Sequence, residues 1–173
     1  MKHVVLLRGI NVGGINIKMV ELRAALTSAG FDDVRTILAT GNVVLESTLP
    51  APEVKKTVEK VLSATFGYEA WVIVLDVSSL QSIIESYPFD VERDGWHPYV
   101  IFGNDADHLR EVVGLADTLD PELESLAPGH RVVYWEVVRG HTTDSRVGKL
   151  LAKAKYKPTT TTRNLRTLVK MLA

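Results

Sequence analysis

The pattern of hydrophobic and polar positions in the first 76 residues predicts four strands and two helices. Short apolar runs, several of them rich in β-branched residues, predict strands at 3–7, 34–38, 43–45 and 71–75. Apolar residues spaced three or four apart predict helices over 18–29 and from Pro50 to Phe66. The order strand, helix, strand, strand, helix, strand is typical of a ferredoxin-like unit. We therefore expect one α+β subdomain over residues 1–76.

The second part of the chain repeats this order more weakly. A connecting helix and loop are expected over 77–96, opened by a capping box of Ser78 and Gln81. Beyond it, the pattern predicts strands at 98–102, 122–126 and 131–138, and helices capped by Asn104 or Asp105, by Asp144, and by Thr161 or Thr162. We expect a tandem of two ferredoxin-like subdomains with antiparallel sheets, the second over 97–173 and ending in a basic helix.

Composition narrows the class of protein. The chain has 173 residues, and its 46% hydrophobic content with a net charge of −1 excludes a disordered chain. The absence of cysteine excludes disulfide scaffolds, thiol nucleophiles and thiolate metal sites. No apolar run approaches the roughly 20 residues of a membrane span, and the N-terminal run is too short for a signal peptide. We expect a cytoplasmic protein that does not enter a membrane.

The near-zero net charge is the sum of two unlike regions. Residues 145–173 carry a charge of +8 and no acidic residue, whereas residues 1–144 carry −9. Such asymmetry indicates a partner surface, internal pairing of the two regions, or a solvated basic helix. A homodimer and single-stranded nucleic-acid binding through the basic segment are therefore alternative functions. The pI of about 6.5 and the absence of aromatic residues from the strand at 42–47 argue against general affinity for nucleic acid.

Several motifs have the residue types of known sites but not their spacing. Residues 9–14 lack the G-x-G-x-x-G spacing of a dinucleotide loop, and residues 140–149 place too many residues between the glycines for a P-loop. The five histidines are scattered and lack the spacing of metal ligands. His141, Asp144 and Ser145 are hydrolase residue types, but adjacency in sequence is not the geometry of a triad. The sequence predicts no metal, cofactor or catalytic residue.

Two segments remain as candidates for binding an anion. Gly9, Gly13 and Gly14 follow a strand that ends at Arg8, and successive backbone amides in a glycine-rich loop can form an anion-binding nest. Asn11 adds an amide, although the glycines could equally serve only the turn.

The predicted final helix supplies the second segment. Its N-terminus would contain Arg163 and Asn164, and free amides there favour anions. Lys149, in the preceding predicted helix, could converge with Arg163. Ordinary helix capping with a solvent-facing arginine is the alternative.

Five segments together resemble the landmarks of a bacterial family, domain of unknown function 1697. They are LLRGINVGG at 6–14, TGNVV at 40–44, YPF at 87–89, GKL at 148–150 and TTRN at 161–164. The resemblance covers nearly the whole chain and implies a tandem of two ferredoxin-like subdomains, but it supplies no reaction. Thr40 and Gly148 stand where the family usually has serine, so the resemblance does not carry over a role that needs a hydroxyl beside Lys149.

The leading hypothesis is a protein that binds a small anionic ligand, such as a phosphorylated one, in a cleft between the subdomains. The expected ligand-binding residues are Arg8, Asn11, Gly13, Gly14, Asn42, Lys149, Arg163 and Asn164. If the protein is an enzyme, electrostatic stabilisation by Arg8, Lys149 and Arg163 is a more natural mechanism than nucleophilic catalysis.

Overall fold

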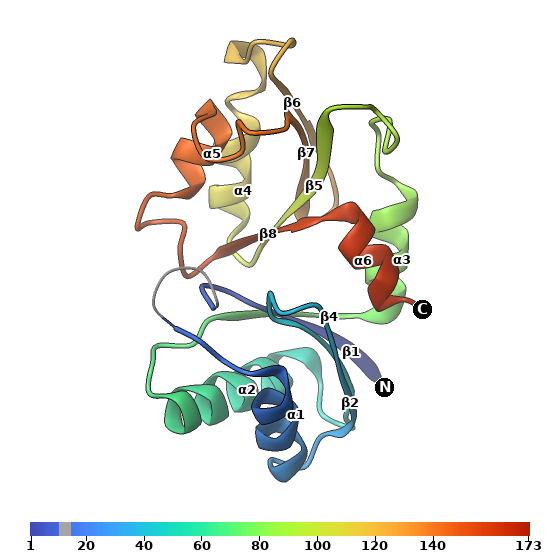
Figure 1. The fold of residues 1–173 in the computed structure, drawn as a ribbon, viewed down its shortest axis with the longest axis vertical. Helices are drawn as coiled ribbons and strands as arrows, with labels where there is room; N and C mark the ends of the chain where they lie inside the picture. The colour runs from blue at the N-terminus through green and yellow to red at the C-terminus, as the bar shows by residue number, and fades with distance from the viewer. Residues whose placement is uncertain (11–14) are drawn as a thin grey trace. The chain divides into compact units, whose positions relative to one another are not determined.

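A computed structural model of the chain describes residues 1–10 and 15–173 (Figure 1). The chain divides into two compact units. Unit 1 comprises Met1–Gln81 together with Lys170–Ala173, and unit 2 comprises Ser82–Val169. Each unit contains a four-stranded sheet in which every strand pairing is antiparallel. The structure is therefore the α+β tandem of two ferredoxin-like subdomains that the sequence predicts.

Unit 1 has the predicted order of elements. These are β1 (Lys2–Leu7), α1 (Met19–Ser28), β2 (Asp32–Ile37), β3 (Asn42–Glu46), α2 (Ala51–Phe66) and β4 (Val72–Asp76). The strand order across the sheet is β2-β3-β1-β4, and α1 and α2 lie on one face of it (Figure 1).

The core of unit 1 lies between these two helices and the sheet. Alternate strand residues, including Val5, Leu7 and Val43, face the helices because successive side chains of a strand point to opposite faces. Leu22 of α1 and Val58 of α2 meet them with the spacing that the helical period requires, and all five side chains are buried. The core fixes the position of the β1 end, where Arg8 leaves the sheet.

Unit 2 repeats the same topology. Helix α3 (Val77–Glu85) crosses the division between the units, and α6 (Leu165–Met171) crosses it again. Between them lie β5 (Trp96–Gly103), α4 (Ala106–Val113), the single 3₁₀ turn η1 (Ala116–Thr118), β6 (Glu124–Pro128), β7 (Val132–Val138), α5 (Arg146–Leu151) and β8 (Thr160–Asn164). The strand order β6-β7-β5-β8 matches that of unit 1, strand for strand.

The core of unit 2 is built on the sheet face that α4 and α5 cover. Ile101 of β5 and Trp135 of β7 pack against Val112 of α4 and Val147 of α5. The side chain of Trp135 is fully buried and is the largest such side chain described. Residues of odd number on β5 and β7 therefore face α4 and α5, and those of even number face away.

The prediction that a helix starts at Thr161-Thr162 is wrong. Residues 160–164 form β8, which pairs with β5 from Thr160 opposite Gly103 to Asn164 opposite Tyr99. Consecutive β-branched threonines favour a pleated strand over a helix. The helix starts at Leu165, and the Asn164 side chain caps it by accepting a 2.9 Å hydrogen bond from the backbone N–H of Arg166.

Two predicted helix caps are also displaced by one or two residues. Ser145, and not Asp144, caps α5, because its Oγ accepts a hydrogen bond from the Gly148 N–H at 3.0 Å. Asp76 caps the first turn of α3, accepting from the Ser79 N–H at 2.7 Å, where a capping box opened by Ser78 was expected. The predicted cap of α4 by Asp105 is confirmed.

Candidate functional site

The unit 1 part of the predicted site lies where β1 ends. The Leu7 N–H donates to the carbonyl of Gly41 at 2.8 Å, and the Arg8 N–H donates to the carbonyl of Trp71 at 3.0 Å. The chain leaving β1 is therefore held between the β2–β3 turn and the residue preceding β4. Gly9 then adopts a φ of +75°, which changes the direction of the chain beyond the strand.

Gly41 brings the first two sequence motifs into contact. A Cβ atom at this position would lie 2.7 Å from the Leu7 Cβ and 3.1 Å from the Ile10 side chain, and the φ of +85° also favours glycine. The turn at 40–42 thus packs directly against the segment that contains Arg8. Motifs separated by about 30 residues in the sequence belong to one local structure.

Arg8 is the charged group of this structure. Its side chain is half-buried, and burial lowers the pKa of the guanidinium because the charged form loses solvation. The group remains a cation at every physiological pH. A half-buried cation gains more from an anionic partner than a fully solvated one does, because the local dielectric is lower.

Asn42 has a structural role in the same turn. The residue is fully buried, and its Nδ2 donates to the carbonyl of Ile37 at 3.0 Å and to Thr40 Oγ1 at 2.7 Å. These bonds hold the turn that positions Gly41 beside Leu7. The other predicted binding residues of this segment, Asn11, Gly13 and Gly14, lie outside the described residues.

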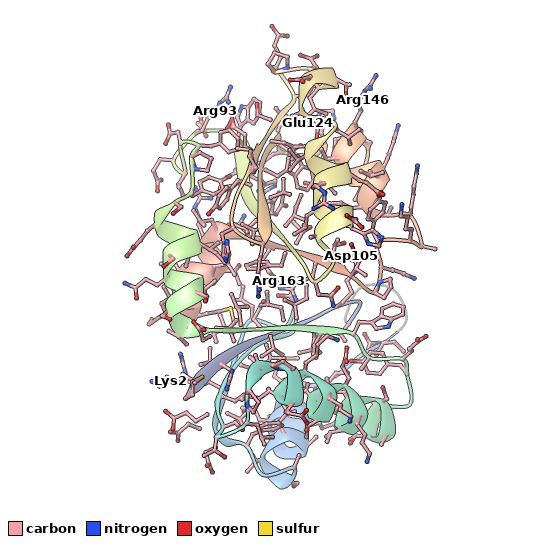
Figure 2. The ribbon with its side chains drawn as sticks, turned by 180° about the vertical axis from the view of Figure 1, so that it is seen from behind. Lys2, Arg93, Asp105, Glu124, Arg146 and Arg163 are labelled. Atoms are coloured by element: carbon pink, nitrogen blue, oxygen red, sulfur yellow. The ribbon has the colours of Figure 1, made fainter. Side chains whose placement is uncertain are left out.

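The predicted residues of unit 2 do not come together. Arg163 lies within β8 opposite Val100, with 9% of its surface exposed, and its Nη1 donates to Thr161 Oγ1 at 2.6 Å and to the Thr162 carbonyl at 3.0 Å (Figure 2). Because residues of even number on β5 face away from α4 and α5, Arg163 lies on that opposite face. The neighbouring Asn164 lies on the other face of the strand and caps α6.

Lys149 is exposed on α5, the helix that covers the face opposite to Arg163. The sheet of unit 2 thus separates Lys149 from Arg163. The residue before Lys149 is also fixed sterically: a Cβ at Gly148 would lie 1.9 Å from the carbonyl oxygen of Thr142. The serine that the family resemblance places here does not fit against this loop.

Part of the charge asymmetry is resolved inside unit 2. Lys155 forms an ion pair with Glu111 at 2.8 Å, and Arg166 lies 4.0 Å from Glu92. Both pairs join the basic segment 145–173 to the acidic middle of the chain, as internal pairing would require. Among the charges of the basic segment that stay exposed are those of Arg146, Lys149 and Lys153, on α5 and the turn after it.

Glu124 is a buried carboxylate with a structural task. Its Oε1 accepts from the indole N–H of Trp135 at 3.0 Å, and its Oε2 accepts from the backbone N–H of Arg146 at 3.0 Å. Figure 2 shows Glu124 and Arg146 close together at the end of the β6–β7 hairpin. The carboxylate therefore satisfies the first turn of α5 and anchors Trp135, and it is not free for chemistry.

Sequence reasoning did not single out a polar cluster at the start of β5. His97 faces the side of α4 and α5, between the residues that follow β7 and those that follow β8. Arg139 and Arg166 lie near enough to affect the pKa of its imidazole. Strand register, which decides which distant residues meet, would have been needed to find this cluster.

Two negative findings apply to residues 1–10 and 15–173. No group of three or more histidine, aspartate or glutamate side chains is placed to hold a metal ion. No helix in this part of the chain is long and apolar enough to cross a membrane.

Comparison with known proteins identifies the family. No curated protein matches the chain at a significant level. A solved structure, that of a conserved bacterial protein from Streptococcus pneumoniae, is similar with a TM-score of 0.79 and 24% identity, over 98% of this chain and 96% of the other. That similarity shows the fold alone. The family described as "Protein of unknown function (DUF1697)" matches residues 1–134, and the chain therefore belongs to this family.

Proposed function

We propose that unit 1 binds a small anionic ligand at the end of β1, with Arg8 as the principal recognition group. The observation that supports this most directly is the half-buried guanidinium of Arg8, whose pKa is lowered by desolvation. It lies in a segment held in place by the Gly41 and Trp71 carbonyls. A charge fixed in a partly desolvated position is suited to recognising an anion.

The ligand class follows from the chemistry of the guanidinium. Its planar fork matches the two oxygens of a phosphate or carboxylate, which a lysine ammonium cannot do. Phosphorylated metabolites and carboxylates are therefore the first candidates. If the site supports a reaction, Arg8 would act by stabilising negative charge.

The glycine-rich segment that follows Arg8 is the second part of the proposal. Asn11, Gly13 and Gly14 were selected from the sequence for backbone amides that can surround an anion. Their contribution is tested by substitution. Lys149, Arg163 and Asn164 belong to unit 2 and are tested separately, because nothing in that unit brings Lys149 and Arg163 together.

The test is a thermal-stability screen with nucleotides, sugar phosphates and dicarboxylates, followed by calorimetry of each compound that stabilises the protein. For such a compound, Arg8→Gln should weaken binding by about tenfold or more, because a charge-assisted hydrogen bond is lost. Arg8→Lys should recover binding only in part, since it restores the charge without the fork.

Arg110→Gln is the matched control. It removes an equal charge from an exposed arginine of α4 that pairs only with Asp107 among the described contacts, and it should leave affinity unchanged. Circular dichroism establishes that each variant is folded. Full affinity in a folded Arg8→Gln variant, or no stabilisation by any member of the panel, would overturn the proposal.

The homodimer and the nucleic-acid hypotheses remain as alternatives. The exposed Arg146, Lys149 and Lys153 favour the second, since they present positive charge outside the ion pairs described above. Binding to labelled single-stranded oligonucleotides that weakens steeply with salt would support it. Sedimentation at low and high salt tests the first, and a monomer under both conditions would exclude it.

A further inference from the structure

The start of β5 in unit 2 places three basic side chains around one point of the sheet. His97 pairs with Val137 of β7, and the Arg139 N–H donates to the Gly95 carbonyl at 2.9 Å, so Arg139 follows β7 on the same face as His97. On the other side, Tyr99 pairs with Asn164 of β8. Continuing that register would place residue 166 beside His97, at the point where the chain turns into α6.

An aromatic layer supports this cluster from below. The ring centroids of His97 and Tyr99 are 5.3 Å apart, and those of Tyr99 and Trp135 are 5.2 Å apart. Trp135 is fully buried, whereas the other two rings are half-buried. Tyr99 Oη lies 3.4 Å from Thr142 Oγ1, in the loop that leads to α5. The imidazole thus has a rigid apolar support on one side and hydroxyl groups close by.

The charges around His97 are predominantly positive. Burial lowers the pKa of its imidazole, and the guanidinium groups of Arg139 and Arg166 lower it further by repulsion. Arg166 is held in position by donating to the carbonyl of Val91 at 3.0 Å and lies 4.0 Å from the exposed carboxylate of Glu92. Within the described part of the chain, no ion pair involves Arg139.

The acidic groups near the cluster are few and already engaged. Asp144, in the loop that carries Thr142, lies 3.2 Å from the imidazole of His141. Glu92 lies beside Arg166 only, and its side chain is 87% exposed. Neither carboxylate neutralises the pair of guanidinium groups together, so the positive field at His97 remains available to a ligand.

We propose that His97, Arg139 and Arg166 form a binding site for a phosphate group in unit 2, separate from the Arg8 site. The two guanidinium groups flank the imidazole from opposite sides and would bind the anion's oxygens. Tyr99 and Thr142 offer hydroxyl donors at the same end of the sheet. Because bound phosphate would counter the repulsion from both arginines, it would also favour protonation of His97.

Nuclear magnetic resonance of the histidine imidazoles in the full chain provides the test. The probe is inorganic phosphate, titrated at a fixed pH of about 7 with chloride adjusted to constant ionic strength, since phosphate and imidazole both titrate near this pH. We expect a saturable shift of the His97 signals and little change at His108, which packs against Tyr156 elsewhere in unit 2. In the absence of phosphate, the pKa of His97 should lie below its usual range.

Three variants make the result specific. Arg139→Gln should weaken phosphate binding by about tenfold or more and raise the pKa of His97 in the free protein. Arg166→Gln should act in the same direction, and its folding is checked independently because Arg166 also bonds to Val91. Arg110→Gln should change neither quantity.

Two results would overturn the site: no saturable shift at His97, or equal phosphate affinity in wild type and Arg139→Gln. Arg8→Gln should leave the His97 shift unchanged, so failure here and failure of the unit 1 proposal are distinguishable. Glycerol phosphate, with glycerol as its control, separates the two sources of the anion. Tighter binding than inorganic phosphate indicates a phosphate ester, and weaker binding indicates free phosphate.

Discussion

Replacing Gly148 with alanine should destabilise unit 2, although alanine is the better helix former. On an open helix this change would stabilise by about 1 kcal/mol. In α5 the new Cβ would lie 1.9 Å from the Thr142 carbonyl oxygen and 3.0 Å from Ser145 Oγ, where ordinary contacts begin at 3.4 Å. The neighbouring backbone must therefore retreat by about 1.5 Å, the difference between these two limits.

The retreat acts on two contributions to stability. Overpacking against backbone costs about 1–3 kcal/mol. Separating the loop from α5 also weakens the Ser145 cap, which contributes about 1 kcal/mol. After the gain in helix propensity is subtracted, we expect a net loss of about 1–3 kcal/mol in the free energy of unfolding. For a chain of this length, each kcal/mol lowers the Tm by about 2–4 °C.

Urea denaturation followed by far-ultraviolet circular dichroism measures this loss. Gly114→Ala is the control, because Gly114 has a helical φ of −58° after α4 and its added Cβ would approach the Glu111 carbonyl no closer than 3.3 Å. That change should alter stability by less than about 0.5 kcal/mol. A Gly148→Ala protein as stable as wild type, or more stable, would refute the steric argument.

Two further predictions concern buried groups. Glu124→Ala leaves the Trp135 indole N–H and the Arg146 backbone N–H without their acceptor and should cost about 1–3 kcal/mol for each in urea denaturation, with Glu124→Gln costing less because one acceptor oxygen remains; equal losses would contradict this account. Burial raises the pKa of Tyr68 to about 12, so its contribution to stability is present below the unfolded-state pKa of about 10 and is lost as pH rises through 12. Tyr68→Phe should reduce the fall in the urea midpoint over that range, and an identical fall in both proteins would exclude this cause.

The sequence predicts the fold well where local and long-range preferences agree. In unit 1, apolar periodicity and the glycine turns lead to the same six elements that the structure contains. The error at β8 has a definite cause: Leu165, Leu168 and Leu172 have helical spacing, which led to a helix start too early in the chain. The threonines before them have the opposite preference, and pairing with β5 decides their conformation.

Candidate site residues are harder to predict because charge and motif do not specify a face. Arg163 and Lys149 are both basic and lie 14 residues apart, yet a sheet separates them because Arg163 has an even-numbered partner on β5. The contact of Gly41 with Leu7 explains why two motifs accompany each other, but it depends on the register of β1 and β3. The cluster around His97 needs three strands in register and is invisible in any single segment.

The division of the chain has a consequence for the order of folding. Unit 1 is discontinuous: Arg35 on β2 donates to the carbonyl of Met171 at 3.0 Å across 136 residues of sequence, and the whole of unit 2 lies between them. During synthesis from the N-terminus, unit 2 can complete its own contacts while unit 1 still lacks its final four residues. The ribosome must therefore release the last segment before the earlier-made unit is complete, so the half of the protein made first is the half finished last.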